Sequence, residues 1–196
     1  KFGLQFFYSK NGRKFLENIK TDFWLDLKIN DIPQTAMSAI DSLKDLKKCK
    51  YITVHVNGGL EMLKAVKMRS KKVNKKLKIL GVTVLTSLNN KSLKQIGHTK
   101  KVEQLVLKQA NLIKKSNCDG IVCSAHEALL VRKKYKNLFI ITPGIRLPGD
   151  SSHDQMRIMT PKDAFENKVS GIVMGRSLTK GNIKKNTKRL LDHLIK

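Results

Sequence analysis

Short apolar runs alternate with longer amphipathic segments along this chain of 196 residues. The apolar runs are rich in branched and aromatic side chains, which is typical of strands that are buried on both faces. We predict strands at residues 23–27, 51–56, 79–85, 120–123, 138–142 and 171–174. Segments with apolar positions at helical spacing follow them, and we predict helices at residues 33–46, 59–68, 92–97, 102–115, 126–134, 161–167 and 182–195. Strands and helices that alternate in this way predict a parallel sheet covered by helices.

The first residues continue the same pattern. Residues 1–7 resemble the end of another strand, and residues 11–19 its helix, which makes seven strand-helix units. A closed (β/α)8 TIM barrel has eight such units and spans about 200 to 250 residues. We therefore expect a single TIM-barrel domain over residues 1–196 whose first strand is missing at the N-terminus. An open doubly wound sheet is the alternative, but no glycine-rich dinucleotide loop follows an early strand.

The charge of the chain first suggests a nucleic-acid partner, because 40 Lys and Arg residues against 15 Asp and Glu residues give a net charge of +25. The lysines are spread along the whole chain, in doublets such as residues 71–72 and 184–185, and no glycine-aromatic RNA motif, zinc-finger spacing or basic-leucine pattern accompanies them. A Lys-rich solvated surface is therefore favoured over a specific nucleic-acid site. A nucleic-acid-binding protein on the same fold stays open as an alternative.

The sequence contains neither an apolar run of about 18 residues nor the layout of a signal peptide, so we expect no membrane association. Its three cysteines, Cys49, Cys118 and Cys123, are odd in number and lack the spacing of metal ligands. They are expected to be reduced, buried thiols, and the protein is expected to be cytoplasmic.

Polar residues gather at the predicted carboxyl ends of the strands. Asp26 and Lys28 are two positions apart, so alternation along a strand would point both side chains to the same side. Other polar residues near strand ends are His55, Thr86, Ser124, Arg146 and Arg176. Because these ends converge on one rim of a barrel, we predict an active site there. Structural alternatives are an ion pair between Asp26 and Lys28, a hydrogen-bonded core histidine at His55, and helix caps at Thr86 and Ser124.

The loops of the last two strand-helix units suggest a phosphate-binding site. The loops TPGIR, residues 142–146, and GRS, residues 175–177, follow the final two strands, which is the usual position for a phosphate in this architecture. Gly175 allows close approach of the backbone, and Arg176 offers a forked donor. Gln155 would reach over a ligand from a loop that could close as a lid. These features predict a phosphorylated small ligand.

The motifs together resemble one enzyme family. DLKINDIPQT, residues 26–35, is similar to the signature of the orotidine 5'-monophosphate decarboxylases, and HVNGG, VTVLTS, DGIVCS, TPGIR, DQMR and VMGRS follow in the order of the bacterial branch. The resemblance implies decarboxylation of orotidine 5'-monophosphate to uridine 5'-monophosphate in de novo pyrimidine synthesis, with no metal and no organic cofactor.

The resemblance also implies roles for individual residues. Lys1, Asp26 and Lys28 would form an alternating charged array at the reacting carbon, with Lys28 as the proton donor. Asp31 would complete the catalytic set. The family also implies a homodimer, in which Asp31 and Thr35 of one subunit reach into the site of the other. The residues that the resemblance assigns to substrate binding are Lys1, Asp26, Ile32, Thr35, Thr86, Arg146, Gln155, Gly175 and Arg176.

The residue types suit this reaction. Loss of carbon dioxide leaves a carbanion in the plane of the pyrimidine ring, and an ammonium group at Lys28 can stabilise that charge and then protonate it. A metal-dependent sugar-phosphate decarboxylase or synthase is the closest rival, but it would need additional acidic ligands at the rim. A barrel that is kept only as an interaction module is a third alternative.

Overall fold

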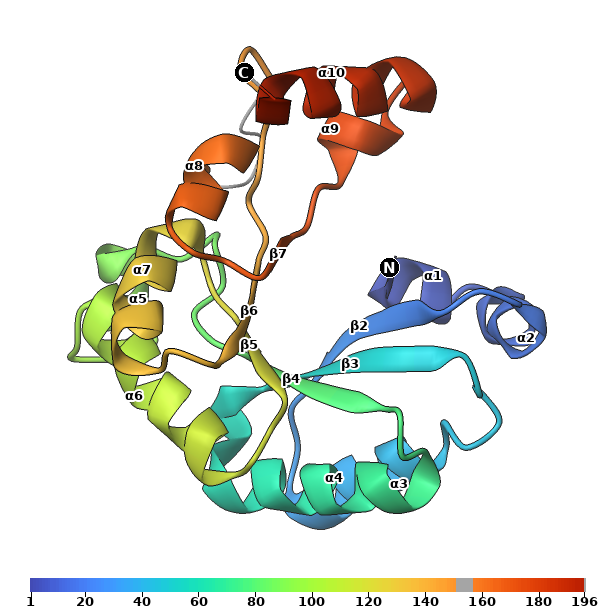
Figure 1. Cartoon of the computed structure of the whole chain (residues 1–196). Coiled ribbons are helices and arrows are strands. Elements are labelled where there is room, and N and C mark those ends of the chain that lie inside the picture. Colours follow the sequence, from blue (N-terminus) through green and yellow to red (C-terminus); the bar gives the residue numbers. More distant parts are fainter. Residues whose placement is uncertain (151–156, 196) are drawn as a thin grey trace. The chain divides into compact units, whose positions relative to one another are not determined.

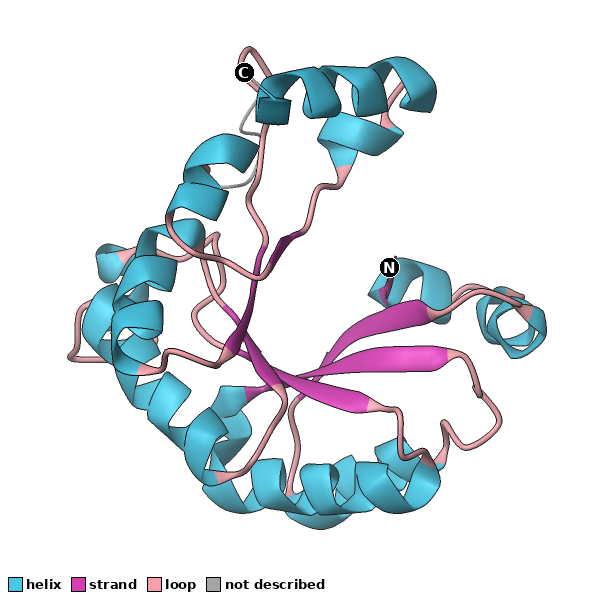
Figure 2. Ribbon diagram, in the orientation of Figure 1, coloured by secondary structure: helices cyan, strands magenta, loops and turns pink. Residues whose placement is uncertain are grey.

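The computed structural model describes residues 1–150 and 157–195 of the chain as an α/β fold, with strands in magenta and helices in cyan in Figure 2. The strands within these residues are β1 (Phe2–Gly3), β2 (Phe23–Ile29), β3 (Cys49–His55), β4 (Lys78–Val82), β5 (Gly120–Val122), β6 (Phe139–Thr142) and β7 (Gly171–Ile172). The α-helices are α1 (Leu4–Phe7), α2 (Gly12–Asn18), α3 (Pro33–Asp41), α4 (Gly59–Val73), α5 (Asn90–Gln95), α6 (Val102–Lys115), α7 (Ala125–Lys134), α8 (Pro161–Glu166), α9 (Arg176–Thr179) and α10 (Ile183–Ile195), with a 3-10 turn, η1 (Val56–Gly58).

The first of two compact units comprises residues 1–83 and 109–120. Its strands pair in parallel in the order β1-β2-β3-β4. Leu25 on β2 is in register with Ile52 on β3, which is in register with Ile79 on β4, and all three side chains are fully buried. Helices α3 and α4 lie side by side along these strands (Figure 1). Such continuous apolar strands are typical of a parallel sheet that is buried on both faces.

The second unit comprises residues 84–108 and 121–196. Its strands follow the order β5-β6-β7, and β6 pairs with β7 in parallel through Ile141 with Gly171 and Thr142 with Ile172. Arg132 on α7 fastens the loops that enter the last two strands, because its guanidinium donates to the carbonyl oxygens of Leu138 and Lys168. The unit therefore joins its helices to its strands through backbone carbonyls as well as apolar packing.

Most predicted elements are confirmed, and some of their boundaries are corrected. The predicted helix at residues 102–115 coincides with α6, whereas the helix predicted at residues 33–46 ends at Asp41 and gives way to tight turns. The strand predicted at residues 79–85 ends at Val82. Helix α9, over residues 176–179, was not predicted. The boundary errors fall at element ends, where local turns decide the conformation, whereas α9 is a complete four-residue helix that the pattern did not indicate.

The prediction of a strand over residues 1–7 is wrong beyond Gly3, because Leu4–Phe7 forms the short helix α1. The helical turn brings the ring of Phe6 to 4.6 Å from that of Phe2 and to 5.5 Å from that of Phe15 on α2. Aromatic residues favour strands by propensity, but packing against other aromatic rings overrides that preference here.

The three cysteines are free and buried, as predicted. Burial raises the pKa of the Cys49 thiol to about 12, although its hydrogen bonds to the backbone near Leu25 and Tyr51 act in the opposite direction. Such a thiol is a poor nucleophile at neutral pH. Within the described residues, none of the helices has the length and the apolar character that crossing a membrane requires.

Candidate active site

A carboxylate between two ammonium groups forms the centre of the candidate site in the first unit. Oδ2 of Asp26 accepts a hydrogen bond from Nζ of Lys1 at 2.8 Å, and Oδ1 accepts one from Nζ of Lys28 at 2.9 Å. The Asp26 side chain is 14% exposed, against 32% for Lys1 and 35% for Lys28. The structure thus brings three of the predicted catalytic residues into one group.

The pKa of Asp26 is lowered from its ordinary value, and the reason is a balance between burial and charge. Burial acts to raise the pKa, but the hydrogen bonds and positive charges of Lys1 and Lys28 together outweigh it. The carboxylate therefore remains ionised at neutral pH. It holds two ammonium groups beside each other that would repel without it.

Lys28 reaches this group by a backbone irregularity and not by simple alternation along β2. The pairing of β2 with β3 shifts register between Leu25 and Ile29, and Lys28 has φ of 50°. A residue with a side chain is uncommon in this left-handed region. The backbone N–H of Lys28 donates to Oγ1 of Thr53 on β3 at 2.9 Å. Asp26 and Lys28 therefore do meet on one side, but through an irregularity in β2 and not through regular alternation.

Thr53 also belongs to this group, although its place in the sequence does not indicate it. Its hydroxyl donates to Oδ1 of Asp26 at 2.9 Å while it accepts from the N–H of Lys28. The only signal in the sequence is a threonine within an apolar strand, which also fits an ordinary strand residue. The side chain is fully buried.

His55 lies at the end of β3, beside this group. Its Nδ1 accepts a hydrogen bond from the N–H of Asn57 at 3.4 Å, and the Asn57 side chain in turn accepts one from Gln109. Burial, followed by the positive charge of Lys28, lowers the pKa of His55. The imidazole is therefore neutral at physiological pH and adds no further positive charge next to Lys28.

The segment that follows β2 is exposed. Asp31 accepts a hydrogen bond from the N–H of Ile32 at 2.7 Å, and the ion pairs of Asp26 do not include it. Ile32 is 66% exposed, and Thr35 is also exposed on the first turn of α3. Pro33 begins that helix, as its place in the sequence predicts. The structure therefore presents Asp31, Ile32 and Thr35 on one exposed stretch of chain.

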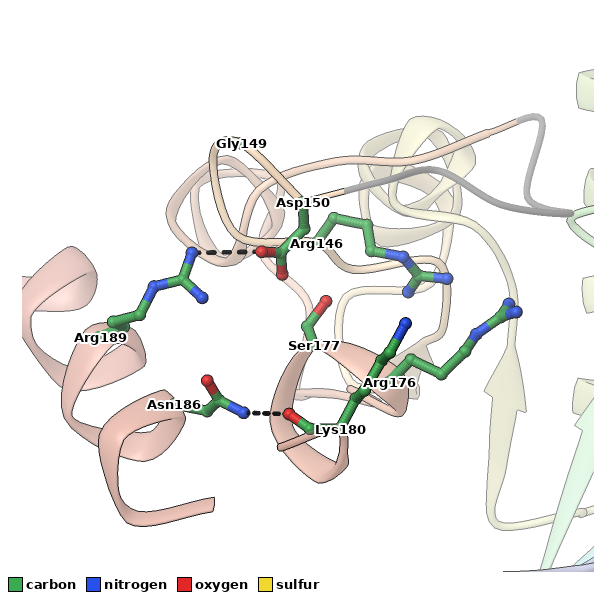
Figure 3. A pocket seen from close by; sticks show the side chains of 8 residues that line it. All are labelled: Arg146, Gly149, Asp150, Arg176, Ser177, Lys180, Asn186 and Arg189. Carbon is green, nitrogen blue, oxygen red and sulfur yellow. Dashed lines mark hydrogen bonds and ion pairs between the residues drawn. The ribbon is translucent and has the colours of Figure 1, made fainter. Parts of the chain in front are cut away.

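The second unit contains a cationic pocket of about 290 Å³, shown in Figure 3. The residues that line it are Arg146, Gly149, Asp150, Arg176, Ser177, Lys180, Asn186 and Arg189. Among the described residues of this lining, Asp150 is the one carboxylate, and it pairs with Arg189 at 3.1 Å. The cationic ends of Arg146, Arg176 and Lys180 point to the same side of the pocket in Figure 3. This excess of forked and ammonium donors suits a phosphate group.

Gly175 leaves the backbone beside this pocket accessible. A Cβ atom built at Gly175 would meet no other atom within 4 Å, so the space next to its backbone is open. Helix α9 begins at the next residue, Arg176. The predicted pair of Gly175 and Arg176 thus places an open stretch of backbone next to a guanidinium, and Arg146, the other predicted arginine, lines the same pocket.

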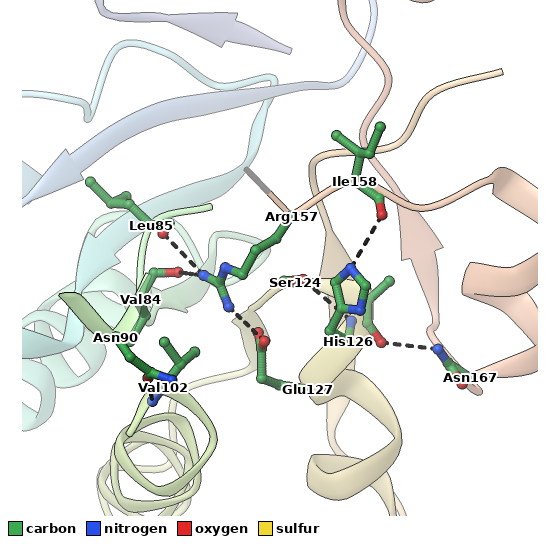
Figure 4. A network of polar contacts seen from close by, with 11 residues as sticks. Val84, Leu85, Asn90, Val102, Ser124, His126, Glu127, Arg157, Ile158 and Asn167 are labelled. Atoms are coloured by element: carbon green, nitrogen blue, oxygen red, sulfur yellow. Dashed lines mark hydrogen bonds and ion pairs between the residues drawn. The ribbon is translucent and has the colours of Figure 1, made fainter. Parts of the chain in front are cut away.

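Thr86 lies in the loop between β4 and α5 and is 8% exposed. The loop is fastened by Arg157, whose Nη2 donates to the carbonyl oxygens of Val84 and Leu85, while its Nη1 pairs with Glu127 on α7 (Figure 4). This buried pair was not predicted. Its only sequence signal was the arginine of the DQMR motif, which carries no sign of its partner.

Two other predicted residues have simpler outcomes. Ser124 caps α7, because its Oγ accepts from the N–H of His126, which confirms the cap interpretation. Gln155 lies outside the described residues. In the part of the chain that the structure describes, no group of three or more His, Cys, Asp or Glu side chains is arranged to hold a metal ion.

Comparison with known proteins agrees with these motifs. The model of the "Orotidine 5'-phosphate decarboxylase / HUMPS family" matches residues 1–189. An orotidine 5'-phosphate decarboxylase of Coxiella burnetii is 36% identical over 195 residues, which cover 96% of this chain and 82% of the relative. The enzyme of that name from Carboxydothermus hydrogenoformans is 40% identical over 186 residues, covering 91% of this chain and 77% of the relative.

Solved structures agree as well. The crystal structure of orotidine 5'-phosphate decarboxylase from Lactobacillus acidophilus has a TM-score of 0.82 and 29% identity, and the match covers 98% of this chain and 85% of that one. The orotidine 5'-monophosphate decarboxylase of Methanocaldococcus jannaschii, complexed with the inhibitor BMP, shares the fold at a TM-score of 0.75 and 22% identity, over 99% of this chain and 85% of that one. The chain belongs to the orotidine 5'-phosphate decarboxylase / HUMPS family.

Proposed function

We propose that the protein catalyses the decarboxylation of orotidine 5'-monophosphate to uridine 5'-monophosphate, a step of pyrimidine synthesis. The group of Lys1, Asp26 and Lys28 carries this proposal, because it holds a charged lysine beside a carboxylate in a half-buried setting. Relatives that are 36% and 40% identical in sequence carry this activity in their names.

In the proposed reaction, the bond between the pyrimidine ring and its carboxylate breaks, and the electron pair stays on the ring carbon. The ammonium group of Lys28 stabilises this carbanion and then transfers a proton to it, while carbon dioxide leaves. Asp26 keeps Lys28 in place through its hydrogen bond, and Lys1 balances the second oxygen of Asp26. The chemistry requires no metal and no organic cofactor.

The remaining residues bind the substrate. We assign the 5'-phosphate to the cationic pocket, with Gly175 and Arg176 as its main contacts. Arg146 and Gln155 would contact the substrate from the closing loop. Thr86 is assigned to the pyrimidine. The energy of phosphate binding, remote from the reacting carbon, would be used to orient the substrate. We also propose that the seven parallel strands belong to a single-domain (β/α)8 barrel, which is supported by the similarity to the Lactobacillus acidophilus enzyme over 98% of this chain.

The exposed stretch after β2 supports a homodimer. Asp31, Ile32 and Thr35 would enter the site of the neighbouring subunit, and a side chain such as Ile32, which is 66% exposed, would be covered there. The test mixes Lys28→Ala chains with Asp31→Ala chains. A hybrid dimer has one intact site, so random exchange should restore about a quarter of wild-type activity. No recovery after proven exchange of subunits would refute the shared site.

The direct test of function follows the ultraviolet absorbance of orotidine 5'-monophosphate in the presence of the purified protein. Lys28→Ala should abolish nearly all conversion. Lys64→Ala is the matched control, because Lys64 is an exposed lysine that pairs with Glu61 on the surface of α4, and this variant should retain full activity. No conversion by the folded wild-type protein would refute the proposal and favour a metal-dependent sugar-phosphate enzyme.

A further inference from the structure

Thr53 links the two residues on which the proposed chemistry depends. It lies on β3 between Ile52 and Val54, which are both fully buried. A hydroxyl can donate one hydrogen bond and accept others, and Thr53 uses both capacities within the candidate site. It accepts from the backbone N–H of Lys28 at 2.9 Å and donates to Oδ1 of Asp26 at 2.9 Å.

These bonds close a ring. The path runs from the backbone N–H of Lys28 to the hydroxyl of Thr53, on to Oδ1 of Asp26, and back to the ammonium group of Lys28 at 2.9 Å. Both ends of the Lys28 residue, its backbone and its charged tip, are therefore tied to the same hydroxyl. The direct hydrogen bond to Thr53 fixes the backbone of Lys28, and the hydrogen bonds through Asp26 fix its ammonium group.

The backbone of Lys28 needs such a partner. Its φ of 50° and the register shift between Leu25 and Ile29 take it out of regular pairing with β3. A backbone N–H that leaves the regular ladder loses its partner there, and an N–H that is shielded from water is unfavourable without one. The hydroxyl of Thr53 accepts the hydrogen bond that a backbone carbonyl oxygen of β3 would accept in regular strand pairing. The backbone conformation of Lys28, which sets the direction of its side chain, thus depends on a side chain of the neighbouring strand.

We propose that Thr53 is a positioning residue for the decarboxylation, because its hydroxyl fixes the backbone of Lys28 and the carboxylate of Asp26 at once. The inference rests on the proposed role of Lys28 as the proton donor. Proton transfer and carbanion stabilisation depend steeply on the position of the donor, so loosening Lys28 should slow the chemical step more than it weakens substrate binding.

Two substitutions separate the hydroxyl from the shape of the side chain. Thr53→Val keeps the branched shape in this apolar strand but removes both hydrogen bonds, whereas Thr53→Ser keeps the hydroxyl and removes only a methyl group. For Thr53→Val we expect kcat to fall about 10- to 100-fold, with KM and the affinity for uridine 5'-monophosphate changed by less than about threefold. Thr53→Ser should remain within about fivefold of wild type.

Control variants exclude a general effect on folding. Ser70 on α4 is fully buried and donates to the carbonyl oxygen of Lys67, so Ser70→Ala also removes a buried hydroxyl, but away from the site. It should retain wild-type kcat. In a Lys28→Ala background, Thr53→Val should reduce the residual rate by less than about twofold, because a residue that acts through Lys28 has nothing left to position.

The outcomes are distinguishable. Wild-type kcat in Thr53→Val, with Lys28→Ala inactive, would refute the role of Thr53 and leave the proposed function intact. Full activity of Lys28→Ala would refute the proposed proton donor, and the positioning role with it. If the valine variant does not fold, Thr53→Cys replaces it, since a thiol is a weaker hydrogen-bonding group. Its kcat should be at least about fivefold below that of Thr53→Ser, and equal values would overturn the inference.

Discussion

Replacement of Arg157 by methionine should destabilise the protein strongly and in a pH-dependent way. Arg157 and Glu127 form an ion pair in which the side chains are only 12% and 3% exposed, and Arg157 also donates to the carbonyl oxygens of Val84 and Leu85. Arg157→Met keeps much of the apolar stem of the side chain but leaves Glu127 buried without its cation. Oε2 of Glu127 already has no hydrogen-bond partner among the described residues.

The size of the effect follows from what Glu127 can do when Arg157 is removed. Burial raises its pKa above the ordinary 4.5, and the charge and hydrogen bond of Arg157 act to lower it, so the substitution raises the pKa further. The carboxyl group can escape burial of its charge by taking up a proton. At pH 7 this costs about 3.4 kcal/mol relative to the unfolded chain, at about 1.36 kcal/mol per pH unit. With the lost bonds to the two carbonyl oxygens, we expect a loss of about 3–5 kcal/mol.

The pH dependence has a definite sign. An acid whose pKa is higher in the folded state binds more protons when folded, so its contribution to stability grows as the pH falls toward the unfolded value. Between pH 7 and pH 5, the free energy of unfolding of Arg157→Met should therefore rise relative to wild type, by about 2 kcal/mol. Urea unfolding at pH 5, 6 and 7, followed by circular dichroism, measures this difference.

Two variants control the experiment. Arg13→Met removes a surface arginine that pairs with Asp45 and is 36% exposed, and its loss should cost less than about 1 kcal/mol. The double variant Glu127→Gln with Arg157→Met removes both charges and should recover at least about 1 kcal/mol at pH 7, without the pH dependence. A loss below about 1 kcal/mol in Arg157→Met, or one that is the same at pH 5 and pH 7, would refute the reasoning.

Two further predictions concern the candidate site. Asp26→Asn should lower kcat at least about 100-fold in the absorbance assay, because both lysines lose the carboxylate between them. Folding lowers the pKa of Asp26, so the stability that this carboxylate contributes is present above its unfolded pKa of 3.8 and is lost as the pH falls through its folded pKa. The unfolding curves of wild type and Asp26→Asn should therefore converge below about pH 4. A difference that stays constant with pH would contradict this. Arg176→Ala should lower kcat/KM about 10- to 100-fold and should weaken competitive inhibition by inorganic phosphate. The control Arg13→Ala should change neither quantity. An unchanged inhibition constant in Arg176→Ala would exclude this arginine from the phosphate site.

The pattern of the sequence was sufficient to predict the α/β class and the long elements. Helix α6 was predicted with its correct ends, because its apolar positions recur at helical spacing over 14 residues. The short elements failed where packing against neighbouring elements decides the conformation. Leu4–Phe7 has the composition of a strand but becomes helical when Phe6 packs between Phe2 and Phe15.

Asp26 and Lys28 were predicted because charges are costly inside a buried strand and therefore indicate function, whereas Lys1 was predicted from the family resemblance alone. The uncharged and paired residues gave no such signal. Arg157 and Glu127 are 30 positions apart, and nothing in either local sequence identifies the partner. Arg189 pairs with Asp150 across 39 positions and lines the cationic pocket, but in the sequence it is one of many basic residues on an amphipathic helix.

Lys28 shows why a motif can be correct when the geometry inferred from it is not. Alternation along a strand predicts that Asp26 and Lys28 share a side, and they do meet, but through a left-handed residue where the register of β2 shifts. A left-handed residue other than glycine leaves little trace in the sequence when the group that stabilises it belongs to another strand. That group is Thr53, whose hydroxyl holds the N–H of Lys28. The position of Lys28 in this chain thus depends on two strands together, because its backbone N–H and its partner Asp26 both bind the hydroxyl of Thr53 on β3.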